Sequence, residues 1–176
     1  MAVLSGLSPK ANRHVPPLRY PHVHRLKAEL PSLQFTLNGG VGSLAEARAH
    51  LTRGLDGVMV GRAAVEDPWH WAGVSAGLYG VPHGVTRREV IATYTDYAEA
   101  EQVLGTPLRH LLRPLLNLFS GDKGAAGWRR GLADGTPTAK QARTQGEPGV
   151  RQVLAEVLPM VPEEVLLRPA GEPRTF

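Results

Sequence analysis

The sequence predicts a small α/β segment followed by an all-helical region. Residues 33–37 alternate between apolar and polar side chains, and residues 57–61 form a short continuous apolar run, which are two patterns typical of strands. A helical pattern separates them, and beyond Val85 only helical patterns remain. Two strands joined by one helix within about 25 residues form a βαβ unit, whose strands must run parallel.

The first elements are bounded by clear stop and start signals. Residues 1–18 are turn-like, Pro21 occupies the favoured first turn of a helix, and Pro31 ends that helix. Ser43 and Glu46 have the spacing of a capping box, which predicts a helix that Gly54 terminates. The apolar run after it suits a strand buried on both faces of a parallel sheet.

The second half reads as helices separated by loops. A helix is expected to begin near Arg62 and another at Thr86, where Glu89 completes the capping-box spacing and the helix runs to residue 104. Residues 108–119 predict a further helix with a kink at Pro114. Residues 121–149 contain few large apolar side chains, so their far half is expected to be a loop or flexible, and short helices follow at 150–158 and 162–167.

Composition excludes several classes of function. The 176 residues carry a formal net charge of +4, which permits a polyanionic partner. The chain has no cysteine, so it contains no disulfide, no thiolate metal site and no cysteine acid or nucleophile. The seven histidines show no metal-ligand spacing, and no apolar run approaches the roughly 18 residues of a membrane span. We therefore expect a protein without a resident metal, a membrane segment or a secretory signal.

Glycines at the ends of both predicted strands indicate a phosphate site. Ligands of parallel α/β folds bind outside the carboxyl ends of the strands, and glycine lets the backbone approach a ligand closely. Asn38, Gly39 and Gly40 follow the first strand, whereas Gly61 and Arg62 follow the second. The guanidinium of Arg62 can donate two parallel hydrogen bonds to phosphate oxygens. The alternative is that these glycines only form tight turns between strands and helices.

These motifs resemble those of a known family. The segment 6–69, with SPKANR at 8–13, NGG at 38–40 and GVMVGRA at 57–63, closely resembles the tRNA-dihydrouridine synthases of the A subgroup. LLNLFSGDKGAAGWRRGL at 115–132 and LAEVLPMVPEEVL at 154–166 resemble the helical domain of that family. A relative of dihydroorotate dehydrogenase is a rival interpretation, but the SPKxNR and LFxGxxGxxxWRR blocks are typical of the tRNA enzymes.

The resemblance implies a fold and an activity. It implies that residues 1–80 form the last quarter of a flavin-binding (β/α)8 TIM barrel and residues 81–176 a helical tRNA-binding domain, flexible near 133–149. It further implies reduction of uridine to dihydrouridine in tRNA, with FMN as cofactor and NADPH as reductant, in the cytoplasm or in an organelle. The five residues Asn38, Gly39, Gly40, Gly61 and Arg62 would hold the FMN phosphate.

The chain departs from the family pattern in one decisive respect. The family donates a proton from a cysteine, and this sequence has none, so no catalytic residue is assigned. A TIM barrel needs eight strands and about 250 residues, but only two strands are predicted here. The sequence therefore indicates the C-terminal portion of an enzyme, inactive alone, with the remaining strands supplied elsewhere. A non-catalytic tRNA- or RNA-binding remnant is the alternative.

Basic residues mark a candidate RNA surface. Residues 109–130 hold five cations against Asp122 alone, and Lys10 and Arg13 lie in a loop expected on the ligand face of the barrel. The RNA-contacting candidates are Lys10, Arg13, Arg109, Arg113, Lys123, Arg129 and Arg130. A solvated helix face is the equally weighted alternative. Trp128 is expected to anchor a core rather than stack on a base, and the Trp69–Trp71 segment to pack against the barrel base.

Overall fold

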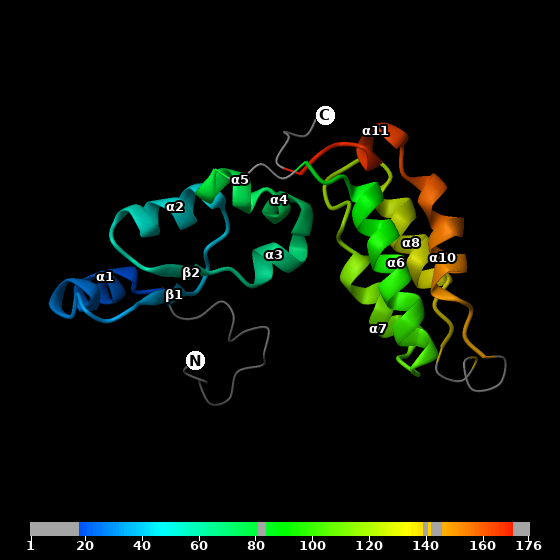
Figure 1. Cartoon of the computed structure of the whole chain (residues 1–176), viewed down its shortest axis with the longest axis horizontal. Coiled ribbons are helices and arrows are strands. Elements are labelled where there is room, and N and C mark those ends of the chain that lie inside the picture. The colour runs from blue at the N-terminus through cyan, green and yellow to red at the C-terminus, as the bar shows by residue number, and fades with distance from the viewer. Residues whose placement is uncertain (1–17, 81–83, 139–140, 142–145, 171–176) are drawn as a thin grey trace. The chain divides into compact units, whose positions relative to one another are not determined.

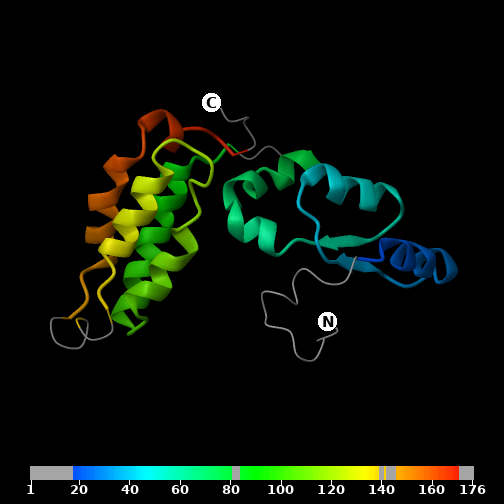
Figure 2. The same ribbon diagram turned by 180° about the vertical axis from the view of Figure 1, so that it is seen from behind.

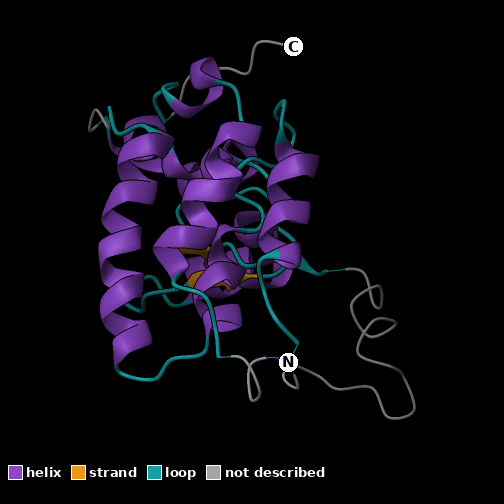
Figure 3. Cartoon of the chain, turned by 90° about the vertical axis from the view of Figure 1, so that its right-hand side faces the viewer, coloured by secondary structure: helices purple, strands orange, loops and turns teal. Residues whose placement is uncertain are grey.

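The computed structural model describes residues 18–80, 84–138, 141 and 146–170, and these divide into two compact units on either side of the Gly61–Arg62 bond (Figure 1). Helices dominate the described residues, and only one small sheet is present among them (Figure 3). The sequence predicts a small α/β segment and a helical region. The structure agrees, since its described residues are mostly helical and contain one pair of parallel strands. The boundary predicted near residue 80 stays a prediction.

The first unit is a βαβ arrangement preceded by a helix. Its elements are α1 (Tyr20–Glu29), β1 (Thr36–Asn38), α2 (Leu44–Thr52) and β2 (Gly57–Met59). The strands pair in parallel, with the register Thr36↔Gly57, Leu37↔Val58 and Asn38↔Met59, and lie side by side in both views (Figures 1 and 2). The predicted parallel pairing is confirmed. The two strands end side by side, so the loops that follow them both begin at the carboxyl end of the sheet.

Local signals account for the bounds of α2. The backbone N–H of Glu46 donates to Ser43 Oγ at 3.1 Å, and the Glu46 carboxylate accepts from the N–H of Gly42 at 2.9 Å. Gly54 ends the helix with φ of +93°, a left-handed conformation that glycine adopts without strain. Ser43 and Gly54 therefore act as the cap and the stop that the sequence predicts.

The core of the first unit is small and its sheet is open. Leu37, Val41, Ala47 and Leu55 are its buried hydrophobic residues among those described. The second strand was expected to be buried on both faces, but Met59 is 48% exposed. That expectation is wrong here because a two-stranded sheet lacks the neighbours that would cover both faces.

The second unit begins with three short helices and continues into a helical bundle. Its elements are α3 (Arg62–Glu66), α4 (Pro68–Ala72), α5 (Val74–Tyr79), α6 (Arg87–Val103), α7 (Leu108–Leu112), the 3₁₀ turn η2 (Arg113–Leu115), α8 (Ala125–Asp134), α10 (Val150–Val157), the 3₁₀ turn η3 (Leu158–Met160) and α11 (Glu163–Leu166). Helix α10 packs against both α6 and α8, and α7 against α6 (Figure 1). The capping box predicted for α6 is present, because Thr86 and Glu89 each accept from the backbone N–H of the other.

Several boundaries differ from those that the sequence predicts. The helix expected over 108–119 ends at Leu112, because Pro114 lacks the N–H that an α-helix needs and the chain tightens into η2. Helix α8 lies in a stretch that no helical pattern marked. The described residues 135–138 and 146–149 contain no helix or strand, but residues 133–134 of the predicted flexible stretch belong to α8. Residues 139–140 and 142–145 lie outside the described residues, and the flexibility of the stretch stays a prediction.

Aromatic residues build the core of the second unit. Trp128 is fully buried, donates from Nε1 to the carbonyl of Leu115 at 2.8 Å, and meets Phe119 edge to face at 4.8 Å. Its role as a core anchor is confirmed. Trp69 was expected to pack against a barrel base, but it lies in this helical core, 4.6 Å from the guanidinium of Arg87. The correction has a physical reason, since the Arg87 cation is attracted to the face of the indole ring.

Candidate functional site

The loop after β1 is formed by two glycines in conformations that other residues rarely adopt. Gly39 has φ of +142° and Gly40 of +67°. A Cβ atom at Gly40 would lie 2.6 Å from Leu18 Cδ1. The positive φ values favour glycine at both positions, and a side chain at Gly40 would in addition displace the end of Leu18. Asn38, the last residue of β1, is exposed beside them.

The loop after β2 leaves from the same edge. Gly61 follows Met59 by two residues, and Met59 is the register partner of Asn38. A Cβ atom at Gly61 would meet Met59 Cε at 3.6 Å, an ordinary contact, so packing alone does not demand glycine there. Within the first unit, the structure thus brings Asn38, Gly39, Gly40 and Gly61 to adjacent strand ends, which is the arrangement of a phosphate site in parallel α/β folds.

Arg62 is the next residue along the chain and the first of α3. Its side chain is exposed. Arg62 belongs to the second unit, so its side chain is described together with α3 and not together with the loop after β1. The five predicted residues offer donors that suit an FMN phosphate: backbone N–H groups, an amide side chain and a guanidinium. The nearby Glu46 carboxylate is engaged in the cap of α2, where it accepts from the Gly42 N–H.

A tyrosine and two histidines support the first loop, and sequence reasoning missed all three. The Tyr20 hydroxyl donates to the carbonyl of Gly39 at 2.8 Å. The Tyr20 ring meets the buried His50 ring edge to face at 4.8 Å, and His50 Nδ1 lies 3.1 Å from His24 Nε2. Tyr20 and His24 are four residues apart on α1, which puts them on one helix face, but nothing in the spacing pointed to His50.

The pKa values in this cluster shift for clear reasons. Burial and the nearby Glu46 carboxylate raise the pKa of Tyr20, so its hydroxyl keeps its proton. Burial, with smaller effects from Arg53 and His50, lowers the pKa of His24. His24 Nδ1 is buried without a hydrogen-bond partner among the described residues, so a proton there is poorly stabilised.

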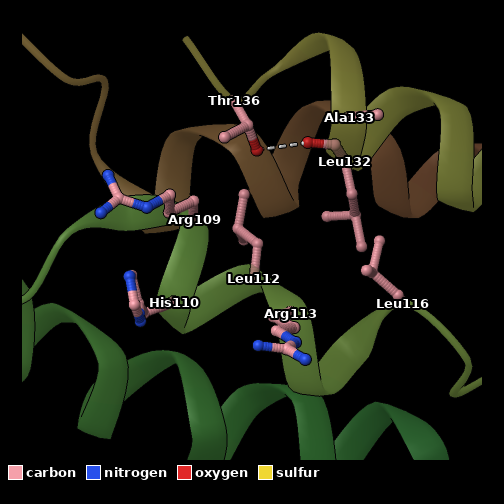
Figure 4. Close-up of a pocket in the computed structure, with 8 residues that line it drawn as sticks. All are labelled: Arg109, His110, Leu112, Arg113, Leu116, Leu132, Ala133 and Thr136. Atoms are coloured by element: carbon pink, nitrogen blue, oxygen red, sulfur yellow. Dashed lines mark hydrogen bonds between the residues drawn. The ribbon is translucent and has the colours of Figure 1, made fainter. Parts of the chain in front are cut away.

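The basic candidates of the second unit gather partly around one cleft. A cleft of about 570 Å³ lies between α7–η2 and α8, with an apolar floor that includes Leu112 and Leu132 (Figure 4). Arg109 and Arg113 line it from the α7–η2 side. On α8, Arg129 lies one turn before Ala133, which also lines the cleft, so Arg129 shares that face.

The remaining cations lie elsewhere on this unit. Arg130 is exposed on a neighbouring face of α8, and Lys123 is exposed in the turn before that helix. No ion pair between described residues involves any of the five cations in this region. Lys10 and Arg13 lie outside the described residues. The structure therefore brings Arg109 and Arg113 to the cleft, whereas Arg129, Arg130 and Lys123 are exposed and do not line it.

The single carboxylate of this basic region does not offset its surface charge. Asp122 is buried, and its two oxygens accept from Arg87 Nη2 at 2.5 Å and from Arg168 Nη1 at 2.8 Å. The five exposed cations therefore stand without a nearby surface anion from their own segment. This favours an anionic partner more strongly than the sequence count suggests.

Comparison with known proteins identifies the family of this chain. The family model described as "Dihydrouridine synthase (Dus)" matches residues 2–154. A tRNA-dihydrouridine(20/20a) synthase of Vibrio cholerae is 45% identical over 134 residues, covering 76% of this chain and 41% of that protein. The one from Vibrio parahaemolyticus is 41% identical over 165 residues, covering 93% and 48%, and the one from Escherichia coli (strain K12) is 46% identical over 134 residues, covering 76% and 39%.

The match extends over most of this chain but not over most of its relatives. The chain spans less than half the length of each of these three synthases. No helix among the described residues is both long and apolar enough to cross a membrane. The described residues also contain no group of three or more potential metal ligands. From the family match over 2–154, the chain belongs to the dihydrouridine synthase family.

Proposed function

We propose that this chain contributes the FMN-phosphate corner and the tRNA-contacting helical unit of a tRNA-dihydrouridine synthase of the A subgroup. The reaction is the NADPH-dependent reduction of uridine to dihydrouridine in tRNA. The observation that carries the proposal is the register of β1 and β2, which sets the NGG loop and Gly61 at the ends of adjacent parallel strands. The family match and the names of the relatives support the substrate.

In this proposal the chain binds rather than reacts. Asn38, the backbone of Gly39, Gly40 and Gly61, and the guanidinium of Arg62 hold the phosphate of FMN, which when bound supplies the redox chemistry. The sequence contains no cysteine to act as a proton donor. We expect the 176-residue chain to form no dihydrouridine by itself, and detectable product from the purified chain would contradict this. The remaining barrel strands then come from a longer polypeptide or from a partner chain, in the cytoplasm or an organelle.

Flavin binding tests the phosphate site. Arg62→Ala removes a cation that can form charge-assisted hydrogen bonds, each worth about 1.5–3 kcal/mol, so FMN affinity is expected to fall at least tenfold. Riboflavin, which has the same ring system without the phosphate, should bind both proteins equally. Arg25→Ala, at an exposed arginine of α1, is the matched control. Equal loss for FMN and riboflavin would contradict a phosphate-specific role of Arg62.

The basic face supports a second candidate, a non-catalytic tRNA-binding protein. It is favoured by Arg109 and Arg113, which line the cleft, and by the exposed Arg129 on α8. Under both candidate functions, Arg129→Ala should weaken tRNA binding. It should also reduce the slope of log K against log[salt] by about 1. Arg151→Ala is the control, because that arginine already pairs with Asp96 and Glu99 on the same unit. Salt-dependent tRNA binding with no FMN binding would favour the second candidate.

The size of the native protein separates the remaining possibilities. Peptides from residues 43–62 can be followed in the source cells by mass spectrometry after separation by size. A product well above 19.0 kDa would support a longer synthase that contains this chain. A product at 19.0 kDa would favour a partner chain or the RNA-binding alternative.

A further inference from the structure

The NGG loop is held from one side by the start of the first unit. The Tyr20 hydroxyl donates to the Gly39 carbonyl at 2.8 Å, which joins α1 to the loop after β1. Leu18 covers the same side, since Cβ atoms at Gly39 and Gly40 would lie 3.1 and 2.6 Å from its methyl carbons. The loop therefore has one closed side, occupied by Leu18 and Tyr20.

The hydrogen bond fixes the direction of one peptide group. In a trans peptide the C=O and the following N–H point in opposite directions. With the Gly39 carbonyl directed at Tyr20, the Gly40 N–H of the same peptide points away from the closed side. An anion is attracted by N–H groups and repelled by carbonyl oxygens, so this orientation is the one that a phosphate requires. The reversed peptide would present the carbonyl oxygen to the anion instead.

Tyr20 is itself held in place by a second helix. Its ring meets His50 of α2 edge to face at 4.8 Å, with an interplanar angle of 73°. His50 is buried and stacks on His24 of α1, with ring centroids 5.3 Å apart. The tyrosine ring is thus held between α1 and α2. The nearby Glu46 carboxylate adds to burial in raising the pKa of Tyr20, so the hydroxyl keeps the proton that it donates to Gly39.

We propose that Tyr20 is a positioning residue of the phosphate loop: its hydroxyl orients the Gly39–Gly40 peptide so that the Gly40 N–H faces the bound anion. The inference rests on the proposed function, because the anion is the phosphate of FMN. It assigns a task to a residue outside the NGG and GVMVGRA motifs. The task belongs to the hydroxyl alone, since a phenylalanine keeps the ring contact with His50.

The orientation is tested without any ligand. In the ¹³C,¹⁵N-labelled full chain, Tyr20→Phe removes the donor to the Gly39 carbonyl. The Gly39 carbonyl carbon and the Gly40 amide belong to one peptide group, so both resonances should move. Tyr97→Phe, at an exposed tyrosine of α6, is the control and should leave Gly40 unchanged. A Gly40 amide that is the same in Tyr20→Phe and in the original chain would overturn the proposal.

The consequence for binding is tested with two flavins. Tyr20→Phe should lower FMN affinity by about tenfold and leave riboflavin affinity unchanged, because only FMN carries the phosphate. Equal loss for both flavins would show general damage to the unit and overturn the proposal. If the original chain binds no FMN, the proposed phosphate site fails, while the Gly40 amide still decides whether Tyr20 orients the peptide.

Discussion

The two compact units of this chain differ in how they complete a core. The helical unit buries a continuous cluster that runs from Trp69 to Ala170 and includes the fully buried Trp128 and Phe119. The βαβ unit buries four hydrophobic residues among those described and leaves Met59 48% exposed. Helices close their own backbone hydrogen bonds, whereas two strands leave both sheet edges open. The comparison indicates that the second unit is stable by its own packing and that the first depends more on single contacts.

Removal of Trp128 should have the largest effect on the helical unit. Trp128→Ala deletes a fully buried indole and its hydrogen bond to Leu115, which should lower the free energy of unfolding by about 3–5 kcal/mol. Urea unfolding followed by circular dichroism measures the change. Val103→Ala is the control, since Val103 is 88% exposed and should cost less than about 0.5 kcal/mol. A loss below 1 kcal/mol for Trp128→Ala would break the contrast between the two units.

The buried ion network should come next. Asp122→Asn leaves the cations Arg87 and Arg168 without their carboxylate, so a loss of about 3 kcal/mol is expected. The matched control is Asp96→Asn, which weakens an exposed pair with Arg151 and should cost at most about 1 kcal/mol. Tryptophan fluorescence suits both variants, because Trp69, Trp71 and Trp128 all belong to the second unit. Similar losses for the two variants would mean that burial adds nothing to the Asp122 pairs.

A glycine contact between α8 and α10 allows a finer test. A Cβ atom at Gly131 would lie 2.5 Å from Val157 Cγ1, so Gly131→Ala should destabilise the unit by about 1–3 kcal/mol. At Gly127 on the same helix the nearest atom is Met160 Cβ at 3.4 Å, and Gly127→Ala should be neutral or stabilising by up to about 1 kcal/mol. The midpoint of thermal unfolding should therefore fall for Gly131→Ala and stay the same or rise for Gly127→Ala. An unchanged midpoint for Gly131→Ala would show that α8 and α10 can separate at little cost.

The smallest expected effect is a pH dependence of the βαβ unit. The pKa of His24 is lowered from its ordinary 6.5, so the unfolded chain binds a proton more readily than the folded one. The contribution of His24 to the free energy of unfolding should be fully present above pH 6.5. It should be lost as the pH decreases from 6.5 toward the pKa of His24 in the folded chain. The carboxyl of Asp56, whose pKa lies below 3.8, does not titrate in this range.

This dependence is measured by following NMR resonances of the first unit during urea unfolding at pH 7.5 and at pH 5.5. The groups that face His24 are His50 on α2 and Arg53, the residue that follows α2. Both oppose the protonation of His24. His24→Gln should reduce the difference between the two pH values. An equally large difference in that variant would assign the effect to another group.

Sequence reasoning succeeded where the signal was local. The cap at Ser43, the stop at Gly54 and the box at Thr86 and Glu89 depend on residues within four positions of one another, and all three are present. The parallel pairing of β1 and β2 followed from chain connectivity. The sequence also placed the NGG motif and Gly61 at strand ends, and their role in phosphate binding stays a prediction.

Long-range contacts were beyond that reasoning. Nothing in the local pattern distinguishes Arg87 from its neighbour Arg88, but Arg87 is fully buried and donates to the carbonyls of Leu118 and Val165 as well as to Asp122. Trp69 was assigned to the wrong neighbour for the same reason. Its partner Arg87 is 18 positions away, and only the folded chain brings the two together.

The sequence by itself determined the two strands and their parallel pairing, the helices other than α8 in outline, the family and the absence of a cysteine acid. These follow from periodicity, helix caps and chain connectivity, which depend on nearby residues, and from the amino-acid composition of the whole sequence. Only the tertiary structure decided that the Asp122 side chain is neutralised in the interior, that Arg109 and Arg113 line one cleft, and that Tyr20 holds Gly39. The physical reason is that burial and hydrogen bonding join residues far apart in the chain, and their free energies arise only when the elements pack.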